Sequence, residues 1–151
     1  MKPETANQYL RTKVMSASPA ELRLMLIEGA IRFCHQGRDG LESKDYEKSF
    51  EGLTQAKAII MELINGLRPE VDAELCNRLS GLYTFMYTRL IEANLEKEPS
   101  MVDEVIKLLE YECETWTLLI EQLAKERSGG AVPAPPTSDQ AKPMSTLSVE
   151  G

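Results

Sequence analysis

The side chains best suited to chemistry in this sequence are one histidine and three cysteines. His35 directly follows Cys34, whereas Cys76 and Cys113 stand far along the chain. Neighbouring residues of a helix project about 100° apart, so Cys34 and His35 cannot pair as nucleophile and base. One histidine cannot supply the paired Glu-x-x-His ligands of a di-metal site in a bundle, and the sequence has no Gly-rich phosphate loop. We therefore predict no catalytic residue, no metal site and no cofactor, and hence no enzyme.

His35 leaves one alternative open. Phosphotransfer modules are helical bundles with one exposed histidine, and the stretch CHQGRDG gives His35 small and basic neighbours. A histidine near the end of a helix is more typical of a surface or capping residue.

Composition and charge exclude several classes of protein. The chain of 151 residues has a formal net charge of −7, which argues against nucleic-acid binding because that needs clustered Lys and Arg. No apolar run approaches the roughly 20 residues of a membrane span, and the N-terminal MKPETANQYL lacks the apolar core of a signal peptide. Three distant cysteines without a CxxC spacing fit reduced thiols. These features predict a cytoplasmic protein without membrane insertion.

Four segments with apolar residues at helical spacing predict four helices. Ser18 and Glu21 form a capping box at the start of the first helix, with Pro19 at the first helical position, and Ser100 with Asp103 repeats the capping pattern before the fourth. The two glycines of GRDGLESKD predict the end of the first helix. The expected helices are residues 18–41, 45–67, 69–95 and 100–125.

The short connections predict an all-α fold, an antiparallel up-down-up-down four-helix bundle. The bundle is expected over 18–127, after an N-terminal capping segment at 1–17 and before a Pro-rich, disordered tail at 128–151. The core stripe of the first helix is expected to be Leu22, Leu26, Ala30 and Phe33. The stripes of the second and third helices are expected to be Tyr46, Phe50, Leu53, Ile60, Ile64 and Leu67, and Val71, Leu75, Leu79, Leu82, Met86 and Leu90.

The helices carry more apolar surface than one inner seam can bury. In the third helix the apolar arc from Phe85 to Ile91 covers about 240°, whereas a core-facing stripe needs little over 100°. Contiguous exterior apolar surface usually marks a partner site, and a natural ligand for it is another amphipathic helix. We therefore predict that exterior surfaces of the bundle bind a helical segment of a partner.

Several motifs, in order, resemble the flagellar export chaperone family FliS. YLRTKVMSASPAELRLMLIEGAIRF is similar to the start of that family, and KDYEKSFEGLTQAKAIIMEL to its second helix. LSGLYTFMYTRLIEANLEKEP and VDEVIKLLEYECETW resemble the third and fourth. The similarity covers about residues 8–120. Two positions depart from the family pattern near the presumed binding face: Ile27–Glu28 stands for Tyr-Asp, and Arg23 stands for a residue that is often aliphatic.

This resemblance implies a chaperone that captures the C-terminal segment of flagellin as helices. Capture would prevent premature polymerisation and present flagellin to the type III export apparatus, whose gate components are further expected partners. The N-terminal segment with Tyr9 would cap the binding surface in the free protein. From the apolar surplus and the resemblance, the expected partner-binding residues are Tyr9, Leu10, Val14, Leu24, Ile27, Ile31, Ile59, Met61, Tyr83, Tyr87, Ile91, Leu108 and Tyr111.

A structural homo-oligomer is the remaining alternative. In that case the exterior stripes would bury against another copy of the chain, and even a chaperone leaves room for a weak homodimer. Sizing chromatography with and without a flagellin C-terminal peptide separates the two.

Overall fold

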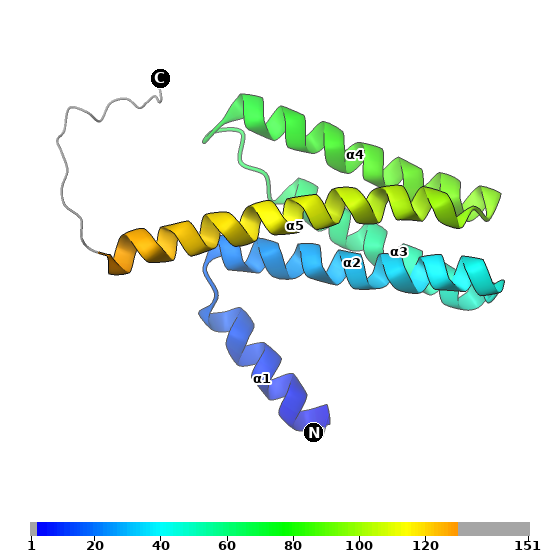
Figure 1. The fold of residues 1–151 in the computed structure, drawn as a ribbon, viewed down its shortest axis with the longest axis horizontal. Helices are drawn as coiled ribbons and strands as arrows, with labels where there is room; N and C mark the ends of the chain where they lie inside the picture. The colour runs from blue at the N-terminus through cyan, green and yellow to red at the C-terminus, as the bar shows by residue number, and fades with distance from the viewer. Residues whose placement is uncertain (1–2, 130–151) are drawn as a thin grey trace. The chain divides into compact units, whose positions relative to one another are not determined.

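The computed structural model describes residues 3–129, and every regular element in that range is a helix (Figure 1). The all-α prediction is confirmed. The predicted tail at 128–151 lies outside the described residues except for its first two positions. The helices are α1 (Pro3–Ser16), α2 (Pro19–Ser43), α3 (Tyr46–Asn65), α4 (Ala73–Glu96) and α5 (Pro99–Ser128).

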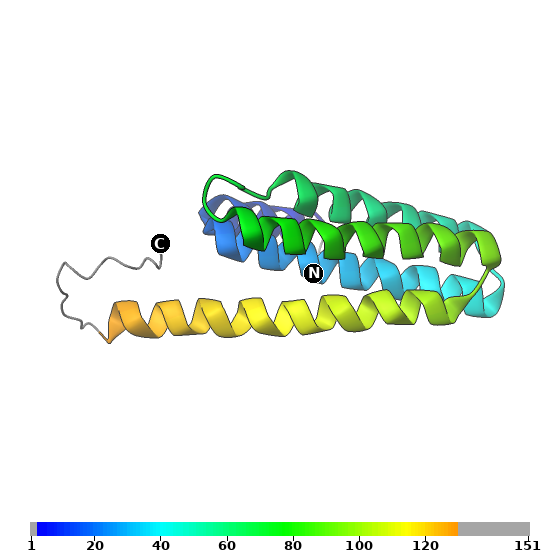
Figure 2. The ribbon, with the colours of Figure 1, turned by 90° about the horizontal axis from the view of Figure 1, so that it is seen from above.

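Of the described residues, 3–116 form one compact unit, and 117–129 belong to a second. In the first unit, α2, α3, α4 and the first part of α5 run in alternating directions as a bundle (Figures 1 and 2). The core is drawn from these four helices. Its largest fully buried side chains are Tyr83, Ile27, Leu53, Ile60, Leu63, Met86, Leu90 and Leu109.

The N-terminus of α2 is fixed by the predicted capping box. The Glu21 amide donates to Ser18 Oγ at 3.2 Å, and the Ser18 amide donates to Glu21 Oε1 at 2.8 Å. α2 ends at Ser43, two residues beyond the expected end at 41, and Gly37 and Gly40 lie inside it. The helix stops only at Lys44, whose φ of 61° is left-handed.

Those glycines lie where the backbones of α2 and α3 come into direct contact, which leaves no room for a side chain. A Cβ on Gly40 would lie 2.5 Å from the Ser49 amide nitrogen. A Cβ on Gly52 would lie 2.6 Å from the Gly37 nitrogen and 2.7 Å from the Phe33 carbonyl oxygen. Glycine is therefore required at these positions for close packing, and its cost in helix propensity is outweighed.

Two helix starts differ from the prediction. The fourth bundle helix begins at Pro99 and contains Ser100, whose amide and hydroxyl both donate to the Glu98 carboxylate, so the predicted Ser100 cap is wrong. The preceding helix begins at Ala73 and not at Pro69. Asp72 is its cap and accepts a hydrogen bond from the Leu75 amide at 3.0 Å.

The burial pattern corrects the predicted core stripes at both ends of the bundle. Tyr46 and Phe50 of α3 are exposed, as are Val71 and Leu75 beside the start of α4. Conversely, Ile27, which is among the expected partner-binding residues, is fully buried.

Among the described residues, no helix is both long enough and apolar enough to span a membrane.

In the second unit, the last part of α5 exposes Leu118, Leu119 and Leu123.

Candidate partner-binding surface

Apolar side chains remain exposed where α3 and α4 lie side by side. Lys57 of α3 places its ammonium 5.9 Å from the ring centroid of Tyr87 of α4, which shows that these two faces adjoin. Met61 follows Lys57 by one helical turn, and Ile91 follows Tyr87 by one turn, so both lie on the same side. Phe50 is 56% exposed and Met61 40% exposed. We call Phe50, Met61, Tyr87 and Ile91 the α3–α4 surface.

A second apolar surface lies on the other side of α4. Arg89 stacks 5.1 Å from the Phe85 ring centroid and pairs with Glu104 of α5 at 3.1 Å, which joins the two helices there. Leu108 follows Glu104 by one turn, and Tyr111, which is 73% exposed, follows Leu108 by three residues. We call Phe85, Leu108 and Tyr111 the α4–α5 surface.

The structure separates the predicted partner-binding residues into three groups. The exposed group comprises Tyr9, Leu10, Val14, Met61, Ile91 and Tyr111, and the half-buried group comprises Leu24, Ile31, Ile59, Tyr87 and Leu108. Ile27 and Tyr83 have no exposed surface, so the prediction that they lie on an exterior face is wrong. Met61, Tyr87 and Ile91 are brought together on one surface, and Leu108 and Tyr111 on another.

The N-terminal segment is a helix, which the sequence analysis did not anticipate. α1 presents Tyr9, Leu10, Val14 and Met15 as exposed side chains. An apolar set of this kind on one short helix is a candidate for contact with another surface.

A buried polar network explains why Tyr83 is internal. Its hydroxyl donates a short hydrogen bond to Glu112 Oε2 and accepts one from Arg23 Nη2 at 3.0 Å. Trp116 Nε1 donates to the same Glu112 oxygen at 3.3 Å, and Arg23 also donates to the Leu63 carbonyl at 3.2 Å. The network thereby ties α2, α3, α4 and α5 together, although Glu112 Oε1 is buried without a hydrogen-bond partner among the described residues.

Burial shifts two titratable groups in the bundle. Burial raises the pKa of Tyr83, the negative charge of Glu112 raises it further, and Arg23 partly offsets both effects. Burial also raises the pKa of the Cys34 thiol to about 12. Cys34 is therefore protonated at neutral pH, and no disulfide joins Cys34, Cys76 or Cys113 within the described residues.

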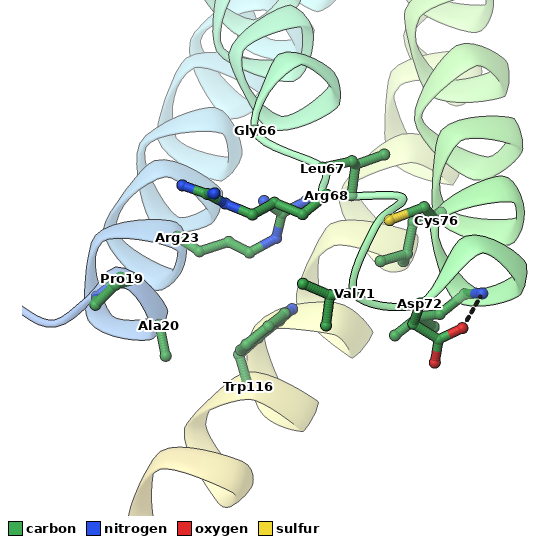
Figure 3. A pocket seen from close by; sticks show the side chains of 12 residues that line it. Pro19, Ala20, Arg23, Gly66, Leu67, Arg68, Val71, Asp72, Cys76 and Trp116 are labelled. Atoms are coloured by element: carbon green, nitrogen blue, oxygen red, sulfur yellow. Dashed lines mark hydrogen bonds between the residues drawn. The ribbon is translucent and has the colours of Figure 1, made fainter. Parts of the chain in front are cut away.

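A cavity of about 440 Å³ lies beside this network, at the end of the bundle where α2 begins. Pro19, Ala20 and Arg23 contribute from α2, and Trp116 from α5 (Figure 3). The connection between α3 and α4 and the first turns of α4 supply the other walls, through Gly66, Leu67, Arg68, Val71, Asp72, Leu75, Cys76 and Leu79.

Sequence reasoning missed this cavity. It assigned Val71 and Leu75 to the core of a helix starting at Pro69, and the cavity exists because residues 66–72 form a loop instead. The one residue of the cavity that the sequence analysis singled out is Arg23. The exposure of Phe50 was missed for a different reason, since helical periodicity does not show where a neighbouring helix ends.

His35 is exposed on α2, and among the described residues no three His, Cys, Asp or Glu side chains are grouped to hold a metal ion. Fold and surface together define an all-α bundle that carries exposed apolar side chains on both sides of one helix, α4. This is the architecture expected of a protein-binding helical bundle.

Comparison with known proteins gives the family. Residues 2–123 match the family described as Flagellar protein FliS. The flagellar secretion chaperone FliS of Bacillus subtilis is 33% identical over 127 residues, covering 84% of this chain and 92% of the relative. The proteins of the same name from Campylobacter jejuni and Salmonella typhimurium are 36% and 38% identical, covering 73% and 74% of this chain and 86% and 83% of the relatives.

The chain therefore belongs to the FliS family of flagellar secretion chaperones. The family resemblance inferred from the sequence motifs is confirmed. These relatives are named as chaperones and not as enzymes, and the match does not favour the phosphotransfer alternative at His35.

Proposed function

We propose that this protein is a cytoplasmic flagellar export chaperone that binds the C-terminal segment of flagellin. The segment docks as helices on the α3–α4 and α4–α5 surfaces, which keeps it from polymerising early and delivers it to type III export. The observation that carries the proposal is the exposure of large apolar side chains on both sides of α4, in a chain of this family. Phe50 and Tyr111 are more than half exposed and would be covered by a docked helix.

Binding of this kind is coupled to folding of the client. Ordering the client segment costs roughly 2–5 kcal/mol or more of the gross interaction energy. Burial of apolar surface offsets that cost at about 25 cal/mol per Å². Aromatic side chains with polar tips, such as Tyr87 and Tyr111, together with the adaptable Met61, suit a surface that accepts a helix.

We further propose that α1 caps part of the client surface in the free protein. Its exposed Tyr9, Leu10 and Val14 offer an apolar set that could exchange with the client. The exposure of these side chains means that the capped state requires another arrangement of α1. Components of the export gate are proposed as later partners of the loaded chaperone.

The test is a pull-down of the organism's flagellin, full length and without its C-terminal segment, on the immobilised protein. We expect full-length flagellin to be retained and the truncated form to be lost. Equal retention of both forms would refute the proposed binding mode. Sizing chromatography with the C-terminal peptide adds a second readout, since a dimer unaffected by the peptide would favour a structural homo-oligomer.

A further inference from the structure

The cavity at the start of α2 joins an apolar wall to two guanidinium groups. Leu67, Val71, Leu75 and Leu79 supply aliphatic surface, and Trp116 supplies an aromatic ring. Arg23 extends from α2, and Arg68 extends toward it from the connection between α3 and α4 (Figure 3). An apolar side chain would fill such a space, and an anion would satisfy its charge.

The charge of Arg23 has no direct carboxylate partner among the described residues. Nη2 donates to the Leu63 carbonyl and to the Tyr83 hydroxyl, both of which are neutral. The guanidinium also stacks 5.5 Å from the Tyr83 ring centroid and 5.8 Å from that of Trp116, which holds it at the cavity wall. Its other N–H groups have no acceptor among the described residues, so they are available to a ligand.

The other charged residues near the cavity do not pair directly with Arg23, and the buried Glu112 carboxylate is joined to it through the Tyr83 hydroxyl. Arg68 pairs with Glu70 at 3.8 Å, and both side chains are well exposed, so the pair is weak. Asp72 is the one acidic residue of the cavity wall, and its carboxylate caps α4 by accepting from the Leu75 amide. The cavity therefore complements an anion, on a chain whose net charge is −7.

We propose that this cavity is an anchoring subsite for the client: it takes a large apolar side chain of the docked helix, while an Asp or Glu side chain on the same helical face binds Arg23. Residues three or four apart on a helix are neighbours, so one turn of the client supplies both groups. The guanidinium offers a fixed fork of donors to the carboxylate. This inference rests on the proposed function and adds a charge requirement that apolar surfaces alone do not impose.

The experiment measures the affinity of the intact protein for a peptide of the flagellin C-terminal segment by calorimetry. Each Asp and Glu of the peptide is changed in turn to Asn or Gln. We expect one of these substitutions to lower the affinity about tenfold. The Arg23→Gln protein should bind the unaltered peptide with an affinity lowered by a similar factor. In the double-mutant cycle, combining Arg23→Gln with the critical peptide substitution should lower the affinity little further than either change alone.

Two further variants locate the effect. Arg68→Gln is expected to weaken binding two- to threefold, because its side chain is exposed. Arg78→Gln is the matched control, since Arg78 is an equally exposed arginine of α4 that does not line the cavity. The affinity of this variant for the peptide should equal that of the wild type. Alkylation of Cys76 by N-ethylmaleimide, followed by mass spectrometry, should slow when the peptide is bound.

The outcomes separate this inference from the proposed function. If the peptide binds but every neutralised form binds equally well, or if Cys76 is alkylated at an unchanged rate, the subsite is refuted and the chaperone function stands. If the original peptide does not bind at all, the proposed function fails. The peptide substitutions leave the protein unaltered, so this test holds even if Arg23→Gln disturbs folding, which a thermal melt reports.

Discussion

The close contact between α2 and α3 predicts that Gly52→Ala strongly destabilises the protein. The added Cβ would lie 2.6 Å from the Gly37 nitrogen and 2.7 Å from the Phe33 carbonyl oxygen, where ordinary contact begins at 3.4 Å. The two backbones must therefore shift apart to admit the added methyl group. Both atoms belong to the backbone, so no side-chain rotation relieves the clash.

The magnitude follows from two opposing terms. Overpacking of a tight core costs about 1–3 kcal/mol, and a contact between backbones lies at or above the top of that range. Alanine regains about 1 kcal/mol of helix propensity over glycine. We expect a net loss of about 2 kcal/mol in the free energy of unfolding, which lowers Tm by about 5–10 °C.

Urea and thermal unfolding followed by circular dichroism measure this loss. Gly81→Ala is the matched control, because Gly81 also lies within a helix and its Cβ would meet nothing within 4 Å. That variant should be more stable than the wild type by about 0.5–1 kcal/mol. A Gly52→Ala protein as stable as the wild type would refute the proposed backbone contact.

Four further predictions follow from the buried network and the exterior surfaces. Tyr83→Phe removes a hydroxyl between two charged groups and should lower the free energy of unfolding by about 1–3 kcal/mol in urea titrations; no change would contradict the network. The raised pKa of Cys34, about 12 against an ordinary 9.0, stabilises the fold below pH 9, and this contribution is lost as the pH rises from 9 toward 12. Unfolding free energies across that range should fall less steeply in Cys34→Ala, and an identical slope would count against burial of the thiol. The double variant Met61→Ser, Ile91→Ser should bind the flagellin peptide at least tenfold more weakly in calorimetry, with little change in Tm. An unaltered affinity would exclude the α3–α4 surface from the binding site. Removal of residues 1–15 should raise the fluorescence of an apolar-surface dye without unfolding the bundle, and an unchanged signal would argue against capping by α1.

Local signals in the sequence placed most of the helix boundaries. The capping box at Ser18 is specific because it needs two residues at a fixed spacing, and the structure contains both of its hydrogen bonds. Ser100 shows the limit of the same rule. Pro99 suits the first helical position, so the helix starts there and Ser100 falls inside it.

Tertiary packing decided what the sequence could not. The glycines of α2 lie near its end and disfavour helix, and their role becomes clear only from the structure, where α3 packs directly against them. Ile27 and Tyr83 belong to broad apolar arcs, and periodicity alone cannot show which part of an arc faces the core. Tyr83 is buried because Arg23 and Glu112, sixty positions back and twenty-nine ahead along the chain, satisfy its hydroxyl.

The exposure of the expected partner-binding residues was predicted only in part, because Ile27 and Tyr83 are buried. Met61, Tyr87 and Ile91 were expected on an exterior surface, and the structure brings them to one face. The cavity depends on a loop from Gly66 to Asp72, which the helical spacing of Val71, Leu75 and Leu79 did not show.

Site-specific photo-crosslinking tests the central claim, that apolar surfaces beside α4 bind flagellin, most directly. Benzoylphenylalanine replaces Phe50 on the α3–α4 surface, Phe85 on the α4–α5 surface, or His35, an exposed residue of α2 on neither surface. Irradiation with full-length flagellin should yield crosslinks to its C-terminal segment from Phe50 and Phe85 and none from His35. Crosslinks from His35 and from neither phenylalanine position would contradict the account.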